Sequence, residues 1–214
     1  MDGQLTEPGG PRFLTVPNLI TLIRLLCIPV FVWLLFGEDA PAAAALLLAV
    51  LGGTDWVDGY VARRFNQVSE LGKAFDPTVD RLLLIVGVGS IIIAGAVPLW
   101  FGLIVVVREV LLSIWVVGLL AAGGVRMDVT FIGKTGTLLL MIAFPAFLAA
   151  SDDRLAPWIT DLLNLVAWGT GLPGLVCSIL AFIGYIPRGL ASLREGREAS
   201  AAIASVAVDQ GGSA

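Results

Sequence analysis

The chain has 214 residues, of which 57% are hydrophobic and only 14% are charged. Its mean hydropathy of +0.93 is too high for an ordinary soluble domain and is typical of a membrane protein. The net charge of −4 argues against a nucleic-acid partner, because nucleic acids bind basic surfaces. The lack of histidine excludes Ser-His-Asp and Cys-His catalysis. It also leaves oxygen ligands for any metal, which favours Mg²⁺ or Mn²⁺.

Six apolar segments are each long enough to cross a membrane as a helix, which takes about 20 residues. They run from about residue 18 to 36, 41 to 65, 72 to 96, 98 to 122, 131 to 150 and 157 to 185. In the last segment, the glycines and the proline between Gly169 and Gly174 predict a break or a kink. We therefore expect an all-α integral membrane protein built as a bundle of six transmembrane helices.

The two ends of the chain differ in composition from this membrane domain, which we expect to span residues 17–187. Residues 1–16 are rich in proline and glycine and are predicted to form a cytoplasmic arm, either loose or as a short interfacial helix. Residues 188–214 form a tail rich in alanine, serine, glycine and charge. We expect a short surface helix from about residue 190 to 204, followed by a disordered end.

The charges between the apolar segments indicate an orientation in the membrane. One set of ends, together with both termini, carries most of the basic residues: Arg12, Arg63, Arg64, Lys73, Arg126, Lys134, Arg188, Arg194 and Arg197. The opposite ends carry mostly acidic residues: Glu38, Asp39, Asp152 and Asp153, with a single Arg154. By the positive-inside rule, both termini face the cytoplasm, and we expect a multi-pass protein of the plasma membrane.

The second segment ends in an ordered run of polar and small residues. On a helix, Asp55, Asp58, Gly59, Ala62 and Arg63 are spaced i, i+3, i+4, i+7 and i+8, which places them on one face. Ionised side chains at membrane depth are costly and usually functional. This face is therefore a candidate site.

The third segment begins with a matching face. Gly72, Asp76 and Asp80 are spaced i, i+4 and i+8. The short connection from Arg63 to Gly72 allows two antiparallel helices whose polar faces meet. Four carboxylates would then converge at one cytoplasmic level of the membrane.

Converging carboxylates repel one another unless cations bridge them. We therefore predict two divalent ions held by four metal ligands, Asp55, Asp58, Asp76 and Asp80. Gly59 and Ala62 leave room for a bulky phosphate ligand, and Arg63 can donate two hydrogen bonds to a phosphate oxygen. Gly72 permits close helix contact. The alternative, that the acids form interface ion pairs with nearby arginines, does not explain four acids on two matched faces.

The pattern D-x-x-D-G-x-x-A-R-x8-G-x-x-x-D-x-x-x-D, from Asp55 to Asp80, resembles the signature of the CDP-alcohol phosphatidyltransferase family. All eight fixed positions are present, and the layout of six apolar segments is similar too. The resemblance implies a Mg²⁺-dependent integral membrane enzyme. Such enzymes transfer a phosphatidyl group from CDP-diacylglycerol to an alcohol and release CMP.

The resemblance also implies a role for each position. Asp55, Asp58 and Asp76 would be metal ligands. Asp80 would be a further ligand or the general base that takes the proton of the acceptor hydroxyl, so the catalytic pair would be Asp76 and Asp80. The CDP moiety would lie along four positions of the motif: Gly59, Ala62, Arg63 and Gly72.

Other polar residues interrupt apolar segments and are candidates for binding the acceptor alcohol. Arg24 follows Asn18 and Thr21 at helical spacing, Arg108 interrupts the fourth segment, and the fifth opens with Lys134 and Thr137. Such side chains can simply reach the membrane interface. We interpret them instead as an anion pocket for the phosphate of the acceptor, close to the aspartates.

The stretch from Val16 to Leu25 resembles the branch that holds phosphatidylglycerophosphate synthases and CDP-alcohol-type cardiolipin synthases. The former often carry a second arginine in the fourth segment, and a second lysine and a glutamine in the fifth. This chain has Val116, Gly136 and Leu140 at those places. Glycerol 3-phosphate is the first expected acceptor, because it is the commoner one in this branch. The alternative is phosphatidylglycerol, a phosphodiester with less charge, which the three departures favour.

A membrane transporter is the alternative outside enzymes, since intramembrane charges can form ion paths. It predicts polar residues through the membrane depth and repeat symmetry, whereas these acids cluster at one level and no internal repeat is visible. The partners expected of the enzyme are CDP-diacylglycerol, the acceptor alcohol, CMP, membrane lipids and a second copy of the chain in a homodimer.

Overall fold

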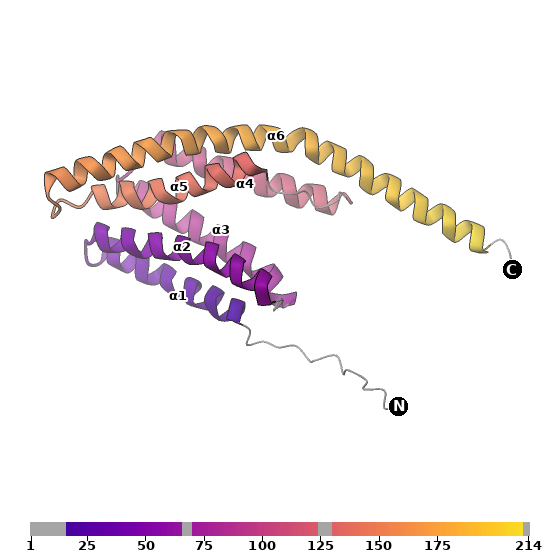
Figure 1. The fold of residues 1–214 in the computed structure, drawn as a ribbon, viewed down its shortest axis with the longest axis horizontal. Coiled ribbons are helices and arrows are strands. Elements are labelled where there is room, and N and C mark those ends of the chain that lie inside the picture. The colour runs from indigo at the N-terminus through magenta and orange to yellow at the C-terminus, as the bar shows by residue number, and fades with distance from the viewer. Residues whose placement is uncertain (1–15, 66–69, 124–129, 212–214) are drawn as a thin grey trace, which may run out of the picture. The chain divides into compact units, whose positions relative to one another are not determined.

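The computed structural model describes residues 16–65, 70–123 and 130–211, with side chains between residues 22–54, 82–119, 121–123 and 130–194. The described residues form six α-helices and no strand, which confirms the all-α prediction (Figure 1). The helices are α1 (Val16–Phe36), α2 (Pro41–Phe65), α3 (Glu70–Ile93), α4 (Leu99–Ala121), α5 (Phe131–Ala150) and α6 (Pro157–Gly211).

The apolar character of these helices is that of a membrane protein. Three stretches among the described residues are long and apolar enough to cross a bilayer: Leu99–Leu119, Phe131–Ala150 and Pro157–Arg194. Three shorter apolar stretches lie in α1, α2 and α3: Leu22–Phe36, Pro41–Thr54 and Leu82–Ile93. Trp33, Trp100 and Trp158 are at least half exposed and lie beside loops that join helix pairs, where membrane proteins place interfacial tryptophans.

Helix α6 differs from its prediction. The break expected between Gly169 and Gly174 is absent, since α6 is continuous from Pro157 to Gly211 and includes the predicted surface helix of the tail. Figure 1 shows α6 as a curved rod. Gly174 serves close packing, because a Cβ there would lie 3.0 Å from Leu139 Cβ. Pro173 costs the helix one backbone hydrogen bond without ending it.

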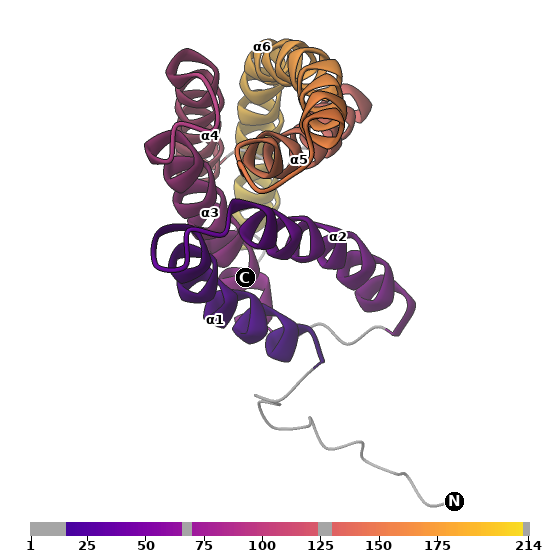
Figure 2. The same ribbon diagram turned by 90° about the vertical axis from the view of Figure 1, so that its left-hand side faces the viewer.

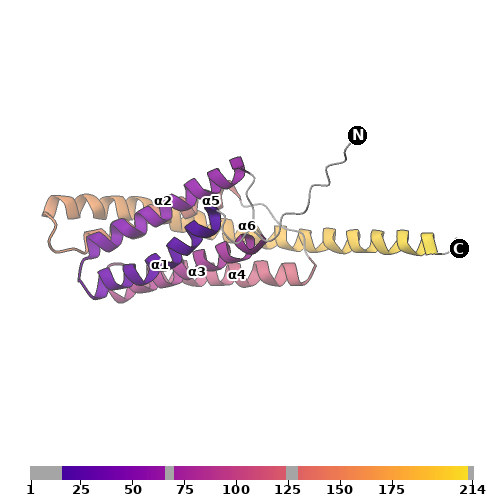
Figure 3. The same cartoon turned by 90° about the horizontal axis from the view of Figure 1, so that it is seen from below.

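The chain forms two compact units, of which the first contains Met1–Val97 and Pro145–Leu163. In this unit α1 packs against both α2 and α3, and Figure 3 shows α1 and α2 side by side, joined by a short loop at one end. The buried face of α1 carries Ile28, Phe31 and Leu35, spaced by three and four residues. This spacing buries one stripe of α1 and leaves its other faces exposed.

Asp152 connects the loop after α5 to the start of α2 in the first unit. Its carboxylate is buried and accepts hydrogen bonds from the backbone N–H of Ala42 (3.2 Å) and of Arg154 (3.0 Å). Ala42 lies in the first turn of α2, where N–H groups lack a partner within the helix. Asp152 therefore caps α2 from a loop 110 residues away in sequence. Asp39, which precedes α2, instead faces Arg154 at 3.8 Å across an exposed pair.

The second unit contains Pro98–Phe144 and Asn164–Ala214. Its core includes a cluster of rings around Phe101, whose centroid lies 6.0 Å from that of Phe144 and 5.9 Å from that of Trp168. The same face of α4 continues through Val105 to Leu119, both buried. Figure 2 shows α4, α5 and α6 from the end of the molecule. Edge-to-face rings and small residues hold this unit together.

Candidate functional site

The four motif aspartates lie on two consecutive helices of the first unit. Asp55 and Asp58 belong to α2, and Asp76 and Asp80 belong to α3, so the helical spacing predicted for both faces is present in the backbone. A Cβ built on Gly87 would lie 3.6 Å from Leu48 Cδ1, so α2 and α3 approach each other farther along. The side chains of the four aspartates lie outside the described ones, and their convergence stays a prediction.

The CDP-binding positions of the motif lie on the same two helices. Gly59, Ala62 and Arg63 belong to the last turns of α2, and Gly72 belongs to the first turn of α3. Their side chains, too, lie outside the described ones. Among the described side chains no group of three acids or cysteines could hold a metal ion. The motif aspartates stay the predicted ligands, because a set of carboxylate oxygens suits a hard cation such as Mg²⁺.

Arg24 lies inside the first unit rather than at its surface. It is only 4% exposed and occupies the same face of α1 as Ile28, Phe31 and Leu35. Because α1 packs against α2 and α3, this cation is buried in the unit that carries the aspartates. A burial this deep rules out a side chain that reaches water at the membrane interface. Its predicted contact with the acceptor stays a prediction.

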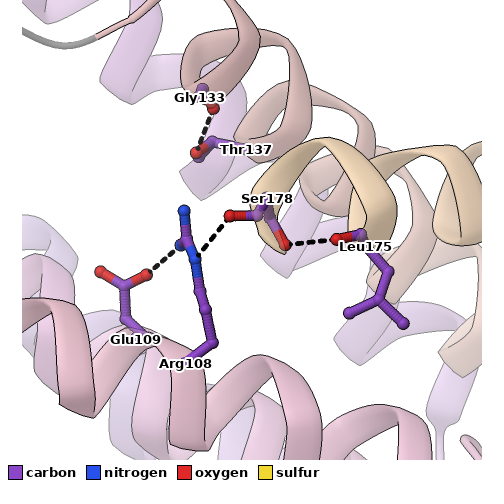
Figure 4. Close-up of polar contacts among 6 residues, drawn as sticks. All are labelled: Arg108, Glu109, Gly133, Thr137, Leu175 and Ser178. Carbon is purple, nitrogen blue, oxygen red and sulfur yellow. Dashed lines mark hydrogen bonds and ion pairs between the residues drawn. The ribbon is translucent and has the colours of Figure 1, made fainter. Parts of the chain in front are cut away.

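Arg108 is held on two sides within the second unit. Its Nε–H donates to the backbone oxygen of Ser178 on α6 at 3.2 Å, and its Nη1 lies 2.6 Å from Oε2 of Glu109 (Figure 4). The arginine side chain is 11% exposed and that of Glu109 is 26% exposed. Arg108 therefore faces α6 rather than the lipid, which excludes simple snorkelling. Its predicted contact with the acceptor stays a prediction.

Helices α5 and α6 approach each other closely beside Arg108. A Cβ on Gly136 would lie only 2.9 Å from the backbone nitrogen of Ser178, and 3.2 Å from two atoms of Cys177. Any side chain at this position would force the two helices to shift, so Gly136 allows the close approach of α5 and α6 beside the Ser178 carbonyl that Arg108 binds. Leu140, one turn farther along α5, is buried next to Gly174. The α5–α6 contact is thus built from small residues and leucine.

The two predicted acceptor residues of α5 have different surroundings. The Thr137 hydroxyl donates to the backbone oxygen of Gly133 at 3.1 Å, and Figure 4 shows it on the turn toward which the Arg108 guanidinium points. Lys134 is exposed in the first turn of α5. That turn is anchored by Tyr185, whose buried hydroxyl accepts a hydrogen bond from the Thr130 N–H at 3.1 Å.

In the second unit the Arg108 guanidinium thus points toward the turn that carries Thr137, and other residues contact these elements that were not expected to. Glu109 was visible in the sequence as an acid beside Arg108 in an apolar helix. The carbonyl of Ser178 had no sequence signal, because any residue supplies one. Tyr185 carried no signal either, since a tyrosine near the end of an apolar segment is ordinary.

Known proteins resemble this chain over most of its length. Residues 14–173 match the CDP-alcohol phosphatidyltransferase family. A CMP-forming cardiolipin synthase of Streptomyces coelicolor is 35% identical over 178 residues, which cover 75% of this chain and 81% of that protein. CDP-diacylglycerol–glycerol-3-phosphate 3-phosphatidyltransferases are 33% identical over 62% of this chain and 76% of the Bacillus subtilis protein. The Escherichia coli protein is 33% identical to this chain, and the match covers 60% of this chain and 73% of that protein.

Proposed function

Because the chain belongs to the CDP-alcohol phosphatidyltransferase family, we propose that it transfers the phosphatidyl group of CDP-diacylglycerol to phosphatidylglycerol, forming cardiolipin and CMP. The aspartate motif on α2 and α3 supports the donor half of this reaction. The α5–α6 contact supports the choice of acceptor. The similarity to a CMP-forming cardiolipin synthase, which extends over 75% of the chain, agrees with both.

The packing at Gly136 is the observation that supports phosphatidylglycerol as the acceptor. A lysine at this position, as phosphatidylglycerophosphate synthases often have, would place its Cβ 2.9 Å from Ser178 N. A glutamine in place of Leu140 would put an amide into a buried apolar contact. A phosphomonoester carries a charge of about −1.5 to −2 at neutral pH, whereas a phosphodiester carries one negative charge. The missing second cation therefore favours the phosphodiester.

The proposed chemistry assigns each group one task. The acceptor hydroxyl attacks the phosphatidyl phosphorus of CDP-diacylglycerol, the bond to the oxygen of CMP breaks, and the Asp80 carboxylate takes the hydroxyl proton. Asp55, Asp58 and Asp76, with Asp80 as a further ligand, would hold two Mg²⁺ or Mn²⁺ ions. These ions would neutralise the pyrophosphate and the leaving CMP. Gly59, Ala62, Arg63 and Gly72 would line the CDP moiety.

Glycerol 3-phosphate is the second candidate acceptor. The relatives from Bacillus subtilis and Escherichia coli support it, as they are named for transfer to glycerol 3-phosphate. Arg108 and Lys134 supply cations that a phosphomonoester would also need. In this case the product would be phosphatidylglycerophosphate, again with release of CMP.

The proposal places the enzyme in the plasma membrane as a homodimer, with its aspartates and both termini at the cytoplasmic side. The alternation of basic and acidic loops supports this orientation. Cysteine labelling in intact cells tests it: a cysteine at Glu38 should react with an impermeant reagent, and one in the C-terminal tail should not. The reverse pattern would contradict the orientation.

Release of CMP by the purified full-length protein tests the proposed reaction. With CDP-diacylglycerol, phosphatidylglycerol and Mg²⁺ in detergent micelles, we expect CMP to form in step with cardiolipin. Omission of the acceptor or addition of EDTA should stop both. If no CMP forms with either phosphatidylglycerol or glycerol 3-phosphate, the proposed function is wrong, and a transporter or a structural role becomes the better hypothesis.

A further inference from the structure

Arg108 is fixed in direction, not merely buried. A guanidinium has five N–H donors in a planar fork, and two of its nitrogens are already engaged. Nε–H bonds to the backbone oxygen of Ser178 at 3.2 Å, and Nη1 lies 2.6 Å from a carboxylate oxygen of Glu109. These contacts come from two different helices, α6 and α4, so the plane of the guanidinium cannot turn without breaking one of them.

The remaining donors point away from both partners. Among the described residues Nη2 has no hydrogen-bond partner, and Nη1 keeps a second N–H beside it. Figure 4 shows this end of the guanidinium directed toward the turn of α5 that carries Thr137. The hydrogen of the Thr137 hydroxyl is already committed to the backbone oxygen of Gly133. No hydrogen bond joins these outer donors to Thr137 or to another described residue, so they form a donor pair in the geometry that suits two phosphate oxygens.

We propose that Glu109 is a positioning residue for acceptor binding: its hydrogen bond holds Arg108 so that Nη1 and Nη2 face the phosphate of the acceptor. This inference rests on the proposed function, because it takes Arg108 as an acceptor-binding residue. Ser178 supplies the second hold through its backbone, which Gly136 allows by admitting α6 so close. The Ser178 side chain does not take part in holding Arg108, since its hydroxyl donates to the backbone oxygen of Leu175 at 2.8 Å.

A second role for Glu109 makes the opposite prediction. If its negative charge matters more than its hydrogen bond, Glu109 repels the acceptor phosphate, and removing the charge should improve acceptor binding. If the hydrogen bond matters more, the amide of glutamine should replace the carboxylate, because its oxygen can still accept from Nη1. Alanine should not replace it. The comparison of glutamine with alanine therefore separates position from charge.

The experiment uses the full-length enzyme in micelles and measures KM for phosphatidylglycerol and for CDP-diacylglycerol, together with Tm. We expect Glu109→Ala to raise the acceptor KM by about 10-fold or more, since about 10-fold is the lower end for loss of a hydrogen bond to a charged group. Glu109→Gln should stay within about 3-fold of the wild type, and the donor KM should change little in both. Asp161, exposed near the start of α6, supplies matched controls: Asp161→Ala and Asp161→Asn should leave both constants unchanged.

Other outcomes contradict the inference in distinct ways. Equal effects of the two Glu109 variants, in either direction, would show that charge rather than position decides. A fall in Tm with both KM values raised would make Glu109 a structural residue only. Arg108→Ala separates this inference from the proposed function. If that variant binds the acceptor normally, the acceptor site itself is misplaced. If it is impaired while Glu109→Ala is not, only the positioning role fails.

Discussion

The donor half and the acceptor half of the proposed site are encoded in different ways. The donor half is one dense motif, from Asp55 to Asp80, carried by the adjoining helices α2 and α3. The acceptor half consists of single residues on α4 and α5 and a backbone oxygen of α6, which lie 70 residues apart between Arg108 and Ser178. A local motif can be read from sequence, whereas a site assembled from distant helices needs the fold.

The two halves also tolerate change differently, for a physical reason. In the donor half the chemistry is expected from carboxylates, so each loss removes a ligand or a base. In the proposed acceptor half Arg108 is held by Glu109 on its own helix and by the Ser178 backbone on α6, and α6 contacts α5 closely at Gly136. We therefore expect packing substitutions such as those at Gly136 to affect the proposed acceptor site indirectly.

The largest effect is expected at the donor end. Asp76→Asn should lower the rate of CMP release by about 100- to 10,000-fold with either acceptor, because it removes a charged oxygen that ligand and base roles require. Release of CMP from CDP-diacylglycerol by the purified variant checks this. Asp161→Asn makes the same chemical change on α6, outside the motif, and should leave the rate of CMP release unchanged. A normal rate of CMP release by Asp76→Asn would contradict the proposed role of the aspartate motif.

The next effect tests the packing that supports the acceptor half. Gly136→Ala should lower the free energy of unfolding by about 1–3 kcal/mol, because its Cβ would meet the Ser178 backbone at 2.9 Å. Thermal unfolding in detergent measures the loss. Gly169→Ala is the control, since nothing lies within 4 Å of a Cβ there, and it should be neutral or stabilising. Equal destabilisation by both substitutions would argue against a close α5–α6 contact.

A smaller effect is expected at the start of α2, which Asp152 caps. Asp152→Ala should cost about 0.5–2 kcal/mol, the usual value of a helix cap. Asp152→Asn should cost less, because Ala42 and Arg154 bond to different carboxylate oxygens and one oxygen is kept. The exposed neighbour variant Asp153→Ala supplies the control. An unchanged Tm in Asp152→Ala would show that this cap does not stabilise α2.

The smallest effect is expected at the ion pair beside that cap. Asp39 and Arg154 are 3.8 Å apart, and their side chains are 92% and 62% exposed. Exposed pairs of this kind contribute between 0 and about 1 kcal/mol. Asp39 also has a φ of 49°, which asparagine tolerates well. Asp39→Asn should therefore leave Tm unchanged, and a marked fall would mean that the loop is held more tightly than its exposure indicates.

Much of the fold was predictable because hydrophobic segments of membrane length are a strong signal. The expected bounds of the first five helices agree with the structure to within about three residues, a usual margin for helix ends. The break predicted at Gly169 to Gly174 is absent, because Gly174 serves close packing and α6 continues through Pro173, whereas a kink there stays a prediction. The long continuation of α6 to Gly211 was not predicted either.

The site was predictable to the extent that it is local. The motif between Asp55 and Asp80 required only helical periodicity, and α2 and α3 supply it. The Ser178 partner of Arg108 could not be predicted, because its oxygen belongs to the backbone and lies 70 residues from Arg108 in sequence. Glycerol 3-phosphate was expected first from sequence with phosphatidylglycerol as the alternative, and we propose phosphatidylglycerol first.

The identity of the lipid product tests the central claim most directly. The purified enzyme should receive CDP-diacylglycerol, Mg²⁺ and equal concentrations of phosphatidylglycerol and glycerol 3-phosphate, and the lipids should be identified by mass spectrometry. We expect cardiolipin as the main product, with one CMP released per molecule formed. Phosphatidylglycerophosphate as the sole product would contradict the assignment of the acceptor.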